Sequence, residues 1–253
     1  MNNPDPDIRY SVIVPAYNEE EYLPGTLASL KEAMSHVDTP GEVIVVDNNS
    51  ADQTSRIATD AGAMVVFEQK NQISRARNTG ARNARGRYLV FLDADSRASG
   101  KLLEAAIRNL EGSFCCGGGA YIALDTILSA RMQRIADWMN FLAAKRGIAP
   151  GCFIYCLREA FEDIGGFSEK IYAAEEILFS RQLRKWGKKH GKPFCQVKAF
   201  SVITSSRKLN HPIRFLFAIL FGLLLPFSIF FRPLCWYWYH KPPKKKRFER
   251  EPG

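Results

Sequence analysis

The sequence lacks the motifs by which several common protein classes are identified. Its six cysteines include no CxxC pair, and no histidines stand at zinc-ligand spacing. Neither a zinc site nor a disulfide framework is therefore indicated, and we expect reduced, buried thiols. No GxGxxG follows the first apolar run and no GxxxxGK[ST] occurs, which removes the main support for the dinucleotide-binding and P-loop classes. The first residues contain no basic stretch followed by an apolar one, so no cleavable secretory signal is predicted.

Charge is distributed unevenly along the chain. The 253 residues carry a formal net charge of +9, from 35 basic and 26 acidic side chains. Residues 241–250 alone contain six basic side chains against one acid, so much of the excess belongs to a basic tail, which we place at 241–253. The apolar content of 46% suits one large α/β domain with a substantial core. We expect no nucleic-acid partner.

Short apolar runs alternate with helical patterns from residue 10 to about residue 125. This alternation is typical of βαβ units around a mainly parallel, Rossmann-like sheet flanked by helices. We expect strands at 10–17, 41–49, 63–69, 87–94 and 117–125, and helices at 18–34, 50–62, 74–86 and 99–112. Further elements are expected as helices at 127–147 and 173–189, a strand or loop leading into a short helix at 151–167, and a late strand at 193–208.

An apolar run of seventeen residues, 215–231, contains no charged side chain. A membrane span needs about 20 residues, and Pro226 would kink such a helix. The aromatic residues at 236–239 and the basic tail suit lipid headgroups. We therefore expect 209–240 to be a hydrophobic, membrane-associated segment, with 213–247 contacting the membrane. The alternatives are a single span, a re-entrant or interfacial segment, and a buried C-terminal helix.

Three of the expected strands end in polar, acidic clusters: PAYNEE at 15–20, DNNSAD at 47–52 and DADS at 93–96. Ligands of open α/β sheets bind beyond the carboxyl ends of the strands, so these clusters should converge on one crevice. Asp93 and Asp95 stand one residue apart and can face the same side, where their oxygens suit Mg²⁺ or Mn²⁺ carried by a diphosphate. Three arginines precede this strand and either meet phosphate or cover an exposed helix: Arg75, Arg77 and Arg82.

Four ordered blocks of the sequence match one known pattern. They are VIVPAYNEEEYLPGTLASL (12–30), VIVVDNNSADQT (43–54), SRARNTGARNARGRYLVFLDADS (74–96) and GGFSEKIYAAEEILFSRQLRKWG (165–187). In this order they resemble the signature blocks of the family 2 glycosyltransferases, which adopt the GT-A fold. The resemblance implies an inverting enzyme that uses a UDP- or GDP-sugar. It also implies a catalytic domain at 1–208, with a nucleotide-binding half at about 8–125 and an acceptor half at about 126–208.

The same resemblance implies roles for individual residues. Those expected to contact the nucleotide sugar are Pro15, Ala16, Tyr17, Glu19, Asp47, Arg77, Asn78, Asp93, Ala94 and Arg207. Asp95 is expected to hold the divalent cation, Mg²⁺ or Mn²⁺, and His211 is a second candidate ligand. Asp93 is expected mainly to position the donor.

The catalytic base is assigned by the resemblance to Glu176, with Glu175 beside it, where the family usually has an ED pair. A glutamate reaches one methylene further than an aspartate. The alternative is that the two acids simply begin a helix, where negative charge interacts favourably with the helix dipole. An acceptor that is already anionic, such as a lipid phosphate, would need no base.

Two other functions are alternatives to a glycosyltransferase. A nucleotidyltransferase would need a glycine-rich loop with a basic residue after the first strand, and the loop here is acidic. A non-catalytic sugar-nucleotide-binding or scaffold protein should have lost its acidic motifs, which are intact here. We expect action on a hydroxyl or lipid-linked acceptor at the cytoplasmic side of the membrane, with peripheral, re-entrant or single-span attachment.

Overall fold

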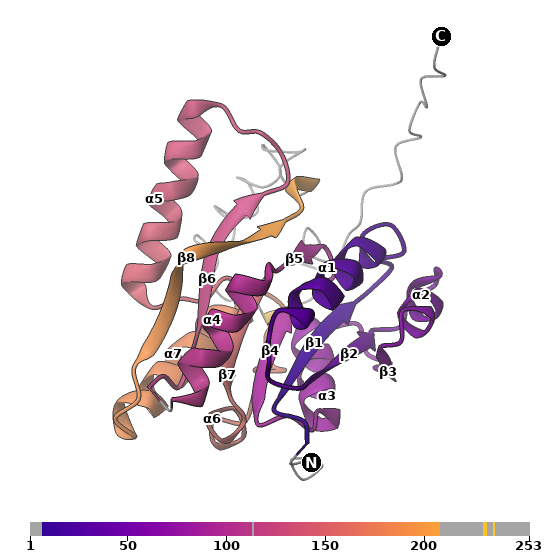
Figure 1. The fold of residues 1–253 in the computed structure, drawn as a ribbon, viewed down its shortest axis with the longest axis horizontal. Helices are drawn as coiled ribbons and strands as arrows, with labels where there is room; N and C mark the ends of the chain where they lie inside the picture. The colour runs from indigo at the N-terminus through magenta and orange to yellow at the C-terminus, as the bar shows by residue number, and fades with distance from the viewer. Residues whose placement is uncertain (1–6, 113, 208–229, 232–234, 236–253) are drawn as a thin grey trace.

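The computed structural model describes residues 7–112, 114–207, 230, 231 and 235. An eight-stranded sheet runs through the centre of the described chain, with strand order β3-β2-β1-β4-β7-β6-β8-β5. Helices cover both of its faces (Figure 1). The α/β architecture predicted from the alternation of apolar runs is confirmed.

The first half of the sheet is parallel and matches the expected elements. Its strands are β1 (Tyr10–Ala16), β2 (Gly41–Asp47), β3 (Met64–Phe67) and β4 (Tyr88–Leu92). The helices of this half are α1 (Leu23–Ser35), α2 (Thr54–Asp60), α3 (Ile73–Asn83) and α4 (Gly100–Glu111). Every residue of β1 and β4 is buried, as expected for strands that are covered by helices on both faces.

The first helix begins at Leu23, five residues later than the sequence pattern suggested. Asn18 has a left-handed backbone with φ of 51°, which a helix does not allow. The amides of this segment bond to the loop before α2 instead: Asn18 N donates to Ser50 Oγ at 2.9 Å and Glu19 N to Thr54 Oγ1 at 2.7 Å. Residues 18–22 therefore form a loop at the carboxyl end of β1.

The second half makes the sheet mixed. Its strands are β5 (Ser96–Arg97), β6 (Gly117–Leu124), β7 (Phe153–Leu157) and β8 (Phe194–Thr204). Strand β7 is antiparallel to both β4 and β6, and β5 is antiparallel to β8. The sequence pattern missed β5, because a strand of two residues carries no periodicity. The helices are α5 (Ala130–Arg146), α6 (Arg158–Asp163) and α7 (Glu175–Lys189).

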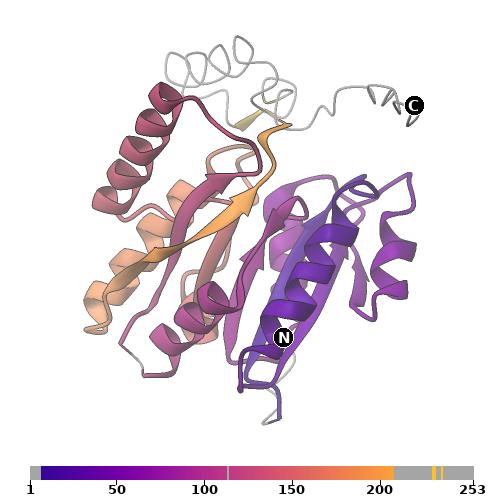
Figure 2. The same cartoon turned by 45° about the horizontal axis from the view of Figure 1, so that its top comes forward.

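The helices divide between the two faces of the sheet. Helices α1 and α4 lie side by side on one face (Figure 2). On the other face, four aromatic rings contributed by β4, α6, α7 and the loop before α7 pack together: Phe91, Phe161, Phe167 and Phe179. The rings of Phe167 and Phe179 stack with centroids 4.1 Å apart. This cluster fixes the start of α7 against the end of β4.

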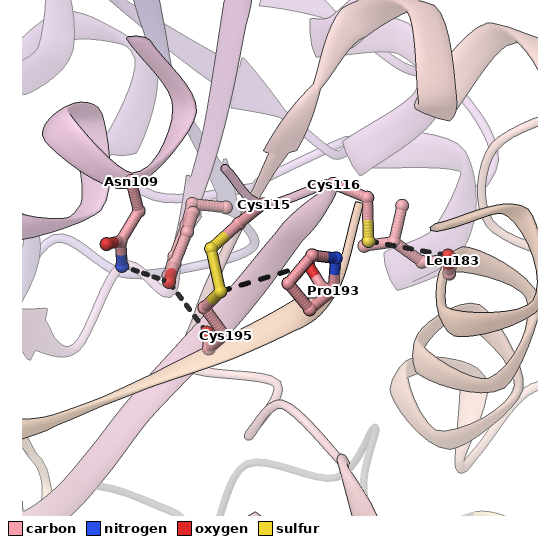
Figure 3. The surroundings of a disulfide bond; sticks show 7 residues. Asn109, Cys115, Cys116, Leu183, Pro193 and Cys195 are labelled. Carbon is pink, nitrogen blue, oxygen red and sulfur yellow. Dashed lines mark hydrogen bonds between the residues drawn. A yellow bond between two sulfur atoms is a disulfide. The ribbon is translucent and has the colours of Figure 1, made fainter. Parts of the chain in front are cut away.

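Two cysteines expected as free thiols are paired instead. Cys115 and Cys195 form a disulfide, with 6.0 Å between their Cα atoms (Figure 3). Strands β6 and β8 run parallel from this point, with Gly118 opposite Cys195. Sheet pairing thus brings together two residues that are 80 apart in sequence, a relation that spacing in the sequence does not reveal. Cys116, Cys152, Cys156 and Cys235 are buried and do not take part in this disulfide.

Membrane attachment stays a prediction. Among the helices of the described residues, none is both long enough and apolar enough to cross a membrane. The expected membrane-associated segment, 209–240, lies outside the described residues except for Phe230, Phe231 and Cys235. The basic tail at 241–253 lies wholly outside them.

A buried arginine joins four parts of the fold. Arg77 of α3 is only 2% exposed. Its Nη1 donates to Glu175 Oε1 at the start of α7 at 2.8 Å, and its Nη2 donates to Asp93 Oδ1 at the end of β4 at 3.0 Å. Nη2 also donates to the carbonyl of Gly151, just before β7, at 2.8 Å. The guanidinium thus fixes α3, β4, β7 and α7 relative to one another.

Replacing Arg77 with methionine should lower the free energy of unfolding by about 3–5 kcal/mol, because the buried Glu175 and the partly exposed Asp93 lose their shared cation. Chemical denaturation measures this loss. Arg75→Met is the matched control on the same helix: its partner is Glu169, both side chains are about a third exposed, and its loss should stay below about 1 kcal/mol. Equal losses in the two variants would contradict the structural role assigned to Arg77.

Candidate active site

The candidate site lies at the carboxyl ends of β1, β2 and β4. Three further segments reach the same edge: the start of α7, the loop before β7 and the end of β8. Most of the residues selected from the sequence come together here, as expected for ligand sites of open α/β sheets. The exception is His211, which lies outside the described residues.

The ends of β1 and β2 form one wall of the site. Pro15 and Ala16 are buried within β1, and Tyr17, which follows them, is half-buried. Asp47 ends β2 opposite Ala16 and is 7% exposed. Its Oδ1 accepts from Ser50 N at 2.9 Å. This bond fixes one oxygen and holds the carboxylate at the edge of the site.

Sequence analysis missed Asn48, which supports the same wall. Its amide nitrogen donates to the carbonyls of Glu68 and Lys70 at 3.0 and 2.7 Å, and its Oδ1 accepts from Gln72 N at 2.9 Å. Asn48 thereby ties β2 to the segment entering α3. No motif marks this role, because it depends on a neighbouring loop 20 to 24 residues away.

The turn at 93–95 is held from both sides. Asp93 N donates to the carbonyl of Cys152 at 3.2 Å, and Thr26 Oγ1 donates to the carbonyl of Ala94 at 2.8 Å. The Ala94 side chain is buried at 3% exposure, so this residue serves as a spacer between the two acids. Burial raises the pKa of the Cys152 thiol far above its usual range, and the charges of Asp93 and Asp95 add to the effect. That thiol is neutral and is not a nucleophile.

The two aspartates of this turn have different cationic partners. Asp93 faces Arg77, and Asp95 Oδ2 lies 2.8 Å from Arg207 Nη2. Arg207 follows β8 and also forms a bidentate pair with Glu19, with distances of 2.8 and 2.9 Å. Its guanidinium lies over the ring of Tyr22 at 4.8 Å. One arginine therefore bridges the loop after β1 and the turn after β4.

A small open pocket of about 110 Å³ lies beside Asp95. It is lined by Glu21, Tyr22, Gly25, Thr26, Asp95, Arg97, Asp125, Ile203 and Thr204. Most of these residues were not selected from the sequence, because they come from α1, β5 and the ends of β6 and β8, which meet only in the folded chain.

Glu175 and Glu176 begin α7 on the opposite wall. The preceding residue, Ala174, has a left-handed backbone with φ of 58°, which turns the helix start toward Arg77. Glu175 is committed to Arg77. Burial raises the pKa of Glu176 to about 7, and the neighbouring charge of Glu175 adds to the rise. Glu176 is therefore the carboxylate of this pair that can exchange a proton near neutral pH.

Gly151 places Glu176 beside Arg77. A Cβ atom built on Gly151 would lie 3.8 Å from the carboxyl carbon of Glu176 and 3.5 Å from Nη2 of Arg77. Cys235, although far along the chain, lies near Glu175. Its thiol is buried, and its pKa is raised mainly by this burial and further by the charge of Glu175. The candidate base, Glu176 in the first turn of α7, thus faces the loop before β7.

Asn78 has a structural contact that the sequence did not reveal. Its Nδ2 donates to the carbonyl of Phe167 at 2.9 Å, and its Oδ1 accepts from Phe167 N at 2.9 Å. Gly166 has φ of 69°, and a Cβ there would lie 2.8 Å from Asn78 Oδ1. The side-chain amide predicted to approach the nucleotide therefore holds the GGF turn that leads to α7.

A divalent cation suits the donor atoms at this edge. No cluster of three or more histidine, cysteine, aspartate or glutamate side chains at metal-binding distance occurs among the described residues. Mg²⁺ and related cations are commonly held by one or two carboxylates together with substrate phosphates. Asp95 and Asp93 meet that smaller requirement, so the residues present fit a cation that arrives with a diphosphate.

The sequence and the fold have known relatives. The sequence model described as glycosyl transferase family 2 matches residues 11–165. The glycosyltransferase AglE of Haloferax volcanii is 26% identical over 190 residues, covering 68% of this chain and 60% of AglE. The undecaprenyl-phosphate 4-deoxy-4-formamido-L-arabinose transferase of Aeromonas hydrophila is 30% identical over 156 residues, covering 57% of this chain and 43% of that protein.

Two similar solved structures contain a bound nucleotide sugar. Residues 1–349 of S. aureus TarS with UDP-GlcNAc give a TM-score of 0.60 at 20% identity, over 79% of this chain and 59% of that one. The mannosyltransferase PcManGT from Pyrobaculum calidifontis with GDP-Man and Mn²⁺ gives 0.58 at 24% identity, over 80% and 58%. This chain thus spans less than two thirds of each of these four proteins. The structural likeness confirms the expected GT-A fold, and the match over 11–165 shows that the chain belongs to glycosyl transferase family 2.

Proposed function

We propose that this protein is an inverting glycosyltransferase that moves a sugar from a UDP- or GDP-sugar to a hydroxyl or lipid-linked acceptor at the cytoplasmic face of a membrane. The observation that carries the proposal is the placement of Asp93, Asp95 and Glu176 around one edge of the sheet, with an arginine beside each wall. The donors in the TarS and PcManGT structures support the donor class. Similarity to the undecaprenyl-phosphate 4-deoxy-4-formamido-L-arabinose transferase of Aeromonas hydrophila supports a lipid-linked acceptor.

On the acceptor side, Glu176 acts as the general base. A base is most effective when its pKa lies near the working pH, and burial places the pKa of Glu176 at about 7. Its carboxylate takes the proton from the acceptor hydroxyl while that oxygen bonds to the anomeric carbon. The bond from this carbon to the diphosphate oxygen breaks, and the nucleoside diphosphate leaves with the electron pair. Glu175, which is bound to Arg77, positions Glu176.

On the donor side, the wall formed by β1 and β2 receives the nucleoside. Asp47 has one oxygen fixed by Ser50 N. Its second oxygen can accept a hydrogen bond from the nucleobase of the donor. Asp93 is oriented by Arg77 and can accept from sugar or ribose hydroxyls. These contacts determine donor affinity and orientation.

Asp95, with Asp93 beside it, would hold Mg²⁺ or Mn²⁺ accompanying the diphosphate; His211 lies outside the described residues. Such a cation, when bound, neutralises charge on the leaving diphosphate. Arg207 now neutralises Asp95 at 2.8 Å. When the donor binds, this guanidinium can turn from Asp95 to the diphosphate oxygens while Glu19 continues to hold it.

A panel of UDP- and GDP-sugars with Mn²⁺ or Mg²⁺ tests the proposed function directly. We expect release of UDP or GDP from one donor class, with loss of release in excess EDTA and in Asp95→Ala. Asp38→Ala, which alters an exposed acid, should behave as wild type. Pyrophosphate release from a nucleoside triphosphate would favour a nucleotidyltransferase instead. Donor binding without turnover under any acceptor mixture would favour a scaffold.

Removing Arg207 should strengthen binding of Mn²⁺ to the donor-free protein. The guanidinium and the metal compete for Asp95, so Arg207→Ala removes both a competing partner of the carboxylate and a repelling charge. Paramagnetic resonance of free Mn²⁺ measures this without any turnover. Arg56→Ala, on exposed α2, is the control and should not change the affinity. Weaker Mn²⁺ binding in Arg207→Ala would show that Asp95 is not the metal ligand.

The rate should depend on the ionisation of Glu176. Since only the carboxylate accepts a proton, kcat/KM should fall about tenfold per pH unit below pH 7 and level off above it. Glu176→Gln should lower kcat by about 10² to 10⁴ while donor affinity persists. Glu159→Gln, at an exposed position of α6, is the control. Full activity of Glu176→Gln on a lipid phosphate would exclude a base role with that acceptor.

A further inference from the structure

Helix α5 exposes an unusually apolar surface. None of its residues is buried, and the helix stands at one side of the sheet, along β6 and β8 (Figures 1 and 2). Five large apolar side chains on it are 45–61% exposed: Met132, Ile135, Trp138, Met139 and Phe141. A contiguous exposed patch of this kind marks an interaction surface.

The central apolar side chains of α5 face away from β6. Asn140 binds β6 through both ends of its amide: its Oδ1 accepts from Ile122 N, and its Nδ2 donates to Ile122 O, each at 2.9 Å. In a helix, residues two and five positions earlier lie about 140–160° around the axis. Trp138 and Ile135 therefore lie opposite the side that contacts β6. This is the reverse of an ordinary surface helix, whose apolar face packs on the core.

The charges of α5 indicate what covers this face. Four basic residues stand on the helix: Arg131, Arg134, Lys145 and Arg146. Within the part of the chain that the structure describes, none of them forms an ion pair. The single acid, Asp137, accepts from Gln133 Nε2 at 2.9 Å. Exposed tryptophan and aliphatic side chains among unpaired lysines and arginines are typical of helices that lie in the interface of an anionic bilayer.

A second copy of the chain fits this surface less well. In a two-fold symmetric contact the same patch faces itself. The four basic residues of one helix would then approach the same four of the other, without acids on the outer face to offset them. Negatively charged lipid headgroups provide that compensation, and acyl chains accept the apolar side chains between the charges.

Both ends of α5 lead directly to the active site. Before the helix, Asp125 accepts from Ser206 N through its Oδ1 at 2.8 Å, next to Arg207. After the helix, Gly151 accepts from Arg77. The segments that flank α5 in the chain therefore form part of the candidate site.

We propose that the outer face of α5 binds the surface of an anionic bilayer, with Ile135, Trp138 and Met139 in the headgroup–acyl boundary and the basic residues on phosphates. This surface is distinct from residues 213–247. Its biological purpose rests on the proposed function, because contact with the bilayer would bring the enzyme to a lipid-linked acceptor. The lipid contact itself can be measured without any turnover.

Quenching of Trp138 by brominated phosphatidylcholine tests the contact in the full chain. In a Trp236→Phe/Trp238→Phe background, vesicles that also contain about 30% phosphatidylglycerol should quench roughly half of the Trp138 emission, because interfacial side chains reach the acyl boundary. Vesicles without phosphatidylglycerol should quench far less. Trp138→Phe in the same background measures the emission of Trp186, which is largely buried, so that this contribution can be subtracted.

A charge-reversal pair separates this surface from the C-terminal segment. Arg134→Glu/Lys145→Glu should abolish the quenching of Trp138, whereas Lys31→Glu/Lys101→Glu, an equal charge change at exposed positions of α1 and α4, should retain it. Vesicle pelleting without quenching of Trp138 would overturn the proposal and leave attachment to residues 213–247. A dimer in sedimentation that Trp138→Glu dissociates would overturn it in favour of a second copy. Quenching with no donor turnover would support the lipid contact and reject the proposed function.

Discussion

The fold and the active site both depend on the buried guanidinium of Arg77. It bonds to Asp93, Glu175 and Gly151, three groups that are far apart in the sequence. Glu175 in particular, whose side chain is 8% exposed, would otherwise carry a large desolvation cost. One cation thus allows Asp93 and Glu175 to lie close together, while the pKa of the neighbouring Glu176 is raised.

A second arginine organises the outer part of the same edge in a more exposed setting. Arg207, which follows β8, joins Glu19 and Asp95. The two arginines differ in burial: Arg77 is 2% exposed and the Arg207 side chain 22%. Arg77 is therefore suited to holding its partners permanently. Arg207 is suited to exchanging Asp95 for a diphosphate, as the proposed function requires.

The mixed half of the sheet connects this chemistry to the surface of the domain. Strand β7 begins next to Asp93, and the segment before it comes from α5. Strands β6 and β8, joined by the Cys115–Cys195 disulfide at their beginning, carry α5 along one side and end beside Arg207. The mixed half of the sheet thus joins an exposed apolar helix to segments that form part of the candidate site.

The sequence by itself determined the elements of the first half, the family and most residues of the candidate site, because apolar periodicity and motifs such as DAD and ARNTG are local. Tertiary structure alone decided the reversal of β7, the short β5, the pairing of Cys115 with Cys195, the support given by Asn48 and the contact of Asn78 with the GGF turn. It also decided which of Glu175 and Glu176 is committed to Arg77. Each of these depends on contacts between residues far apart in the chain, and burial, which sets the proton affinity of Glu176, has no local signature.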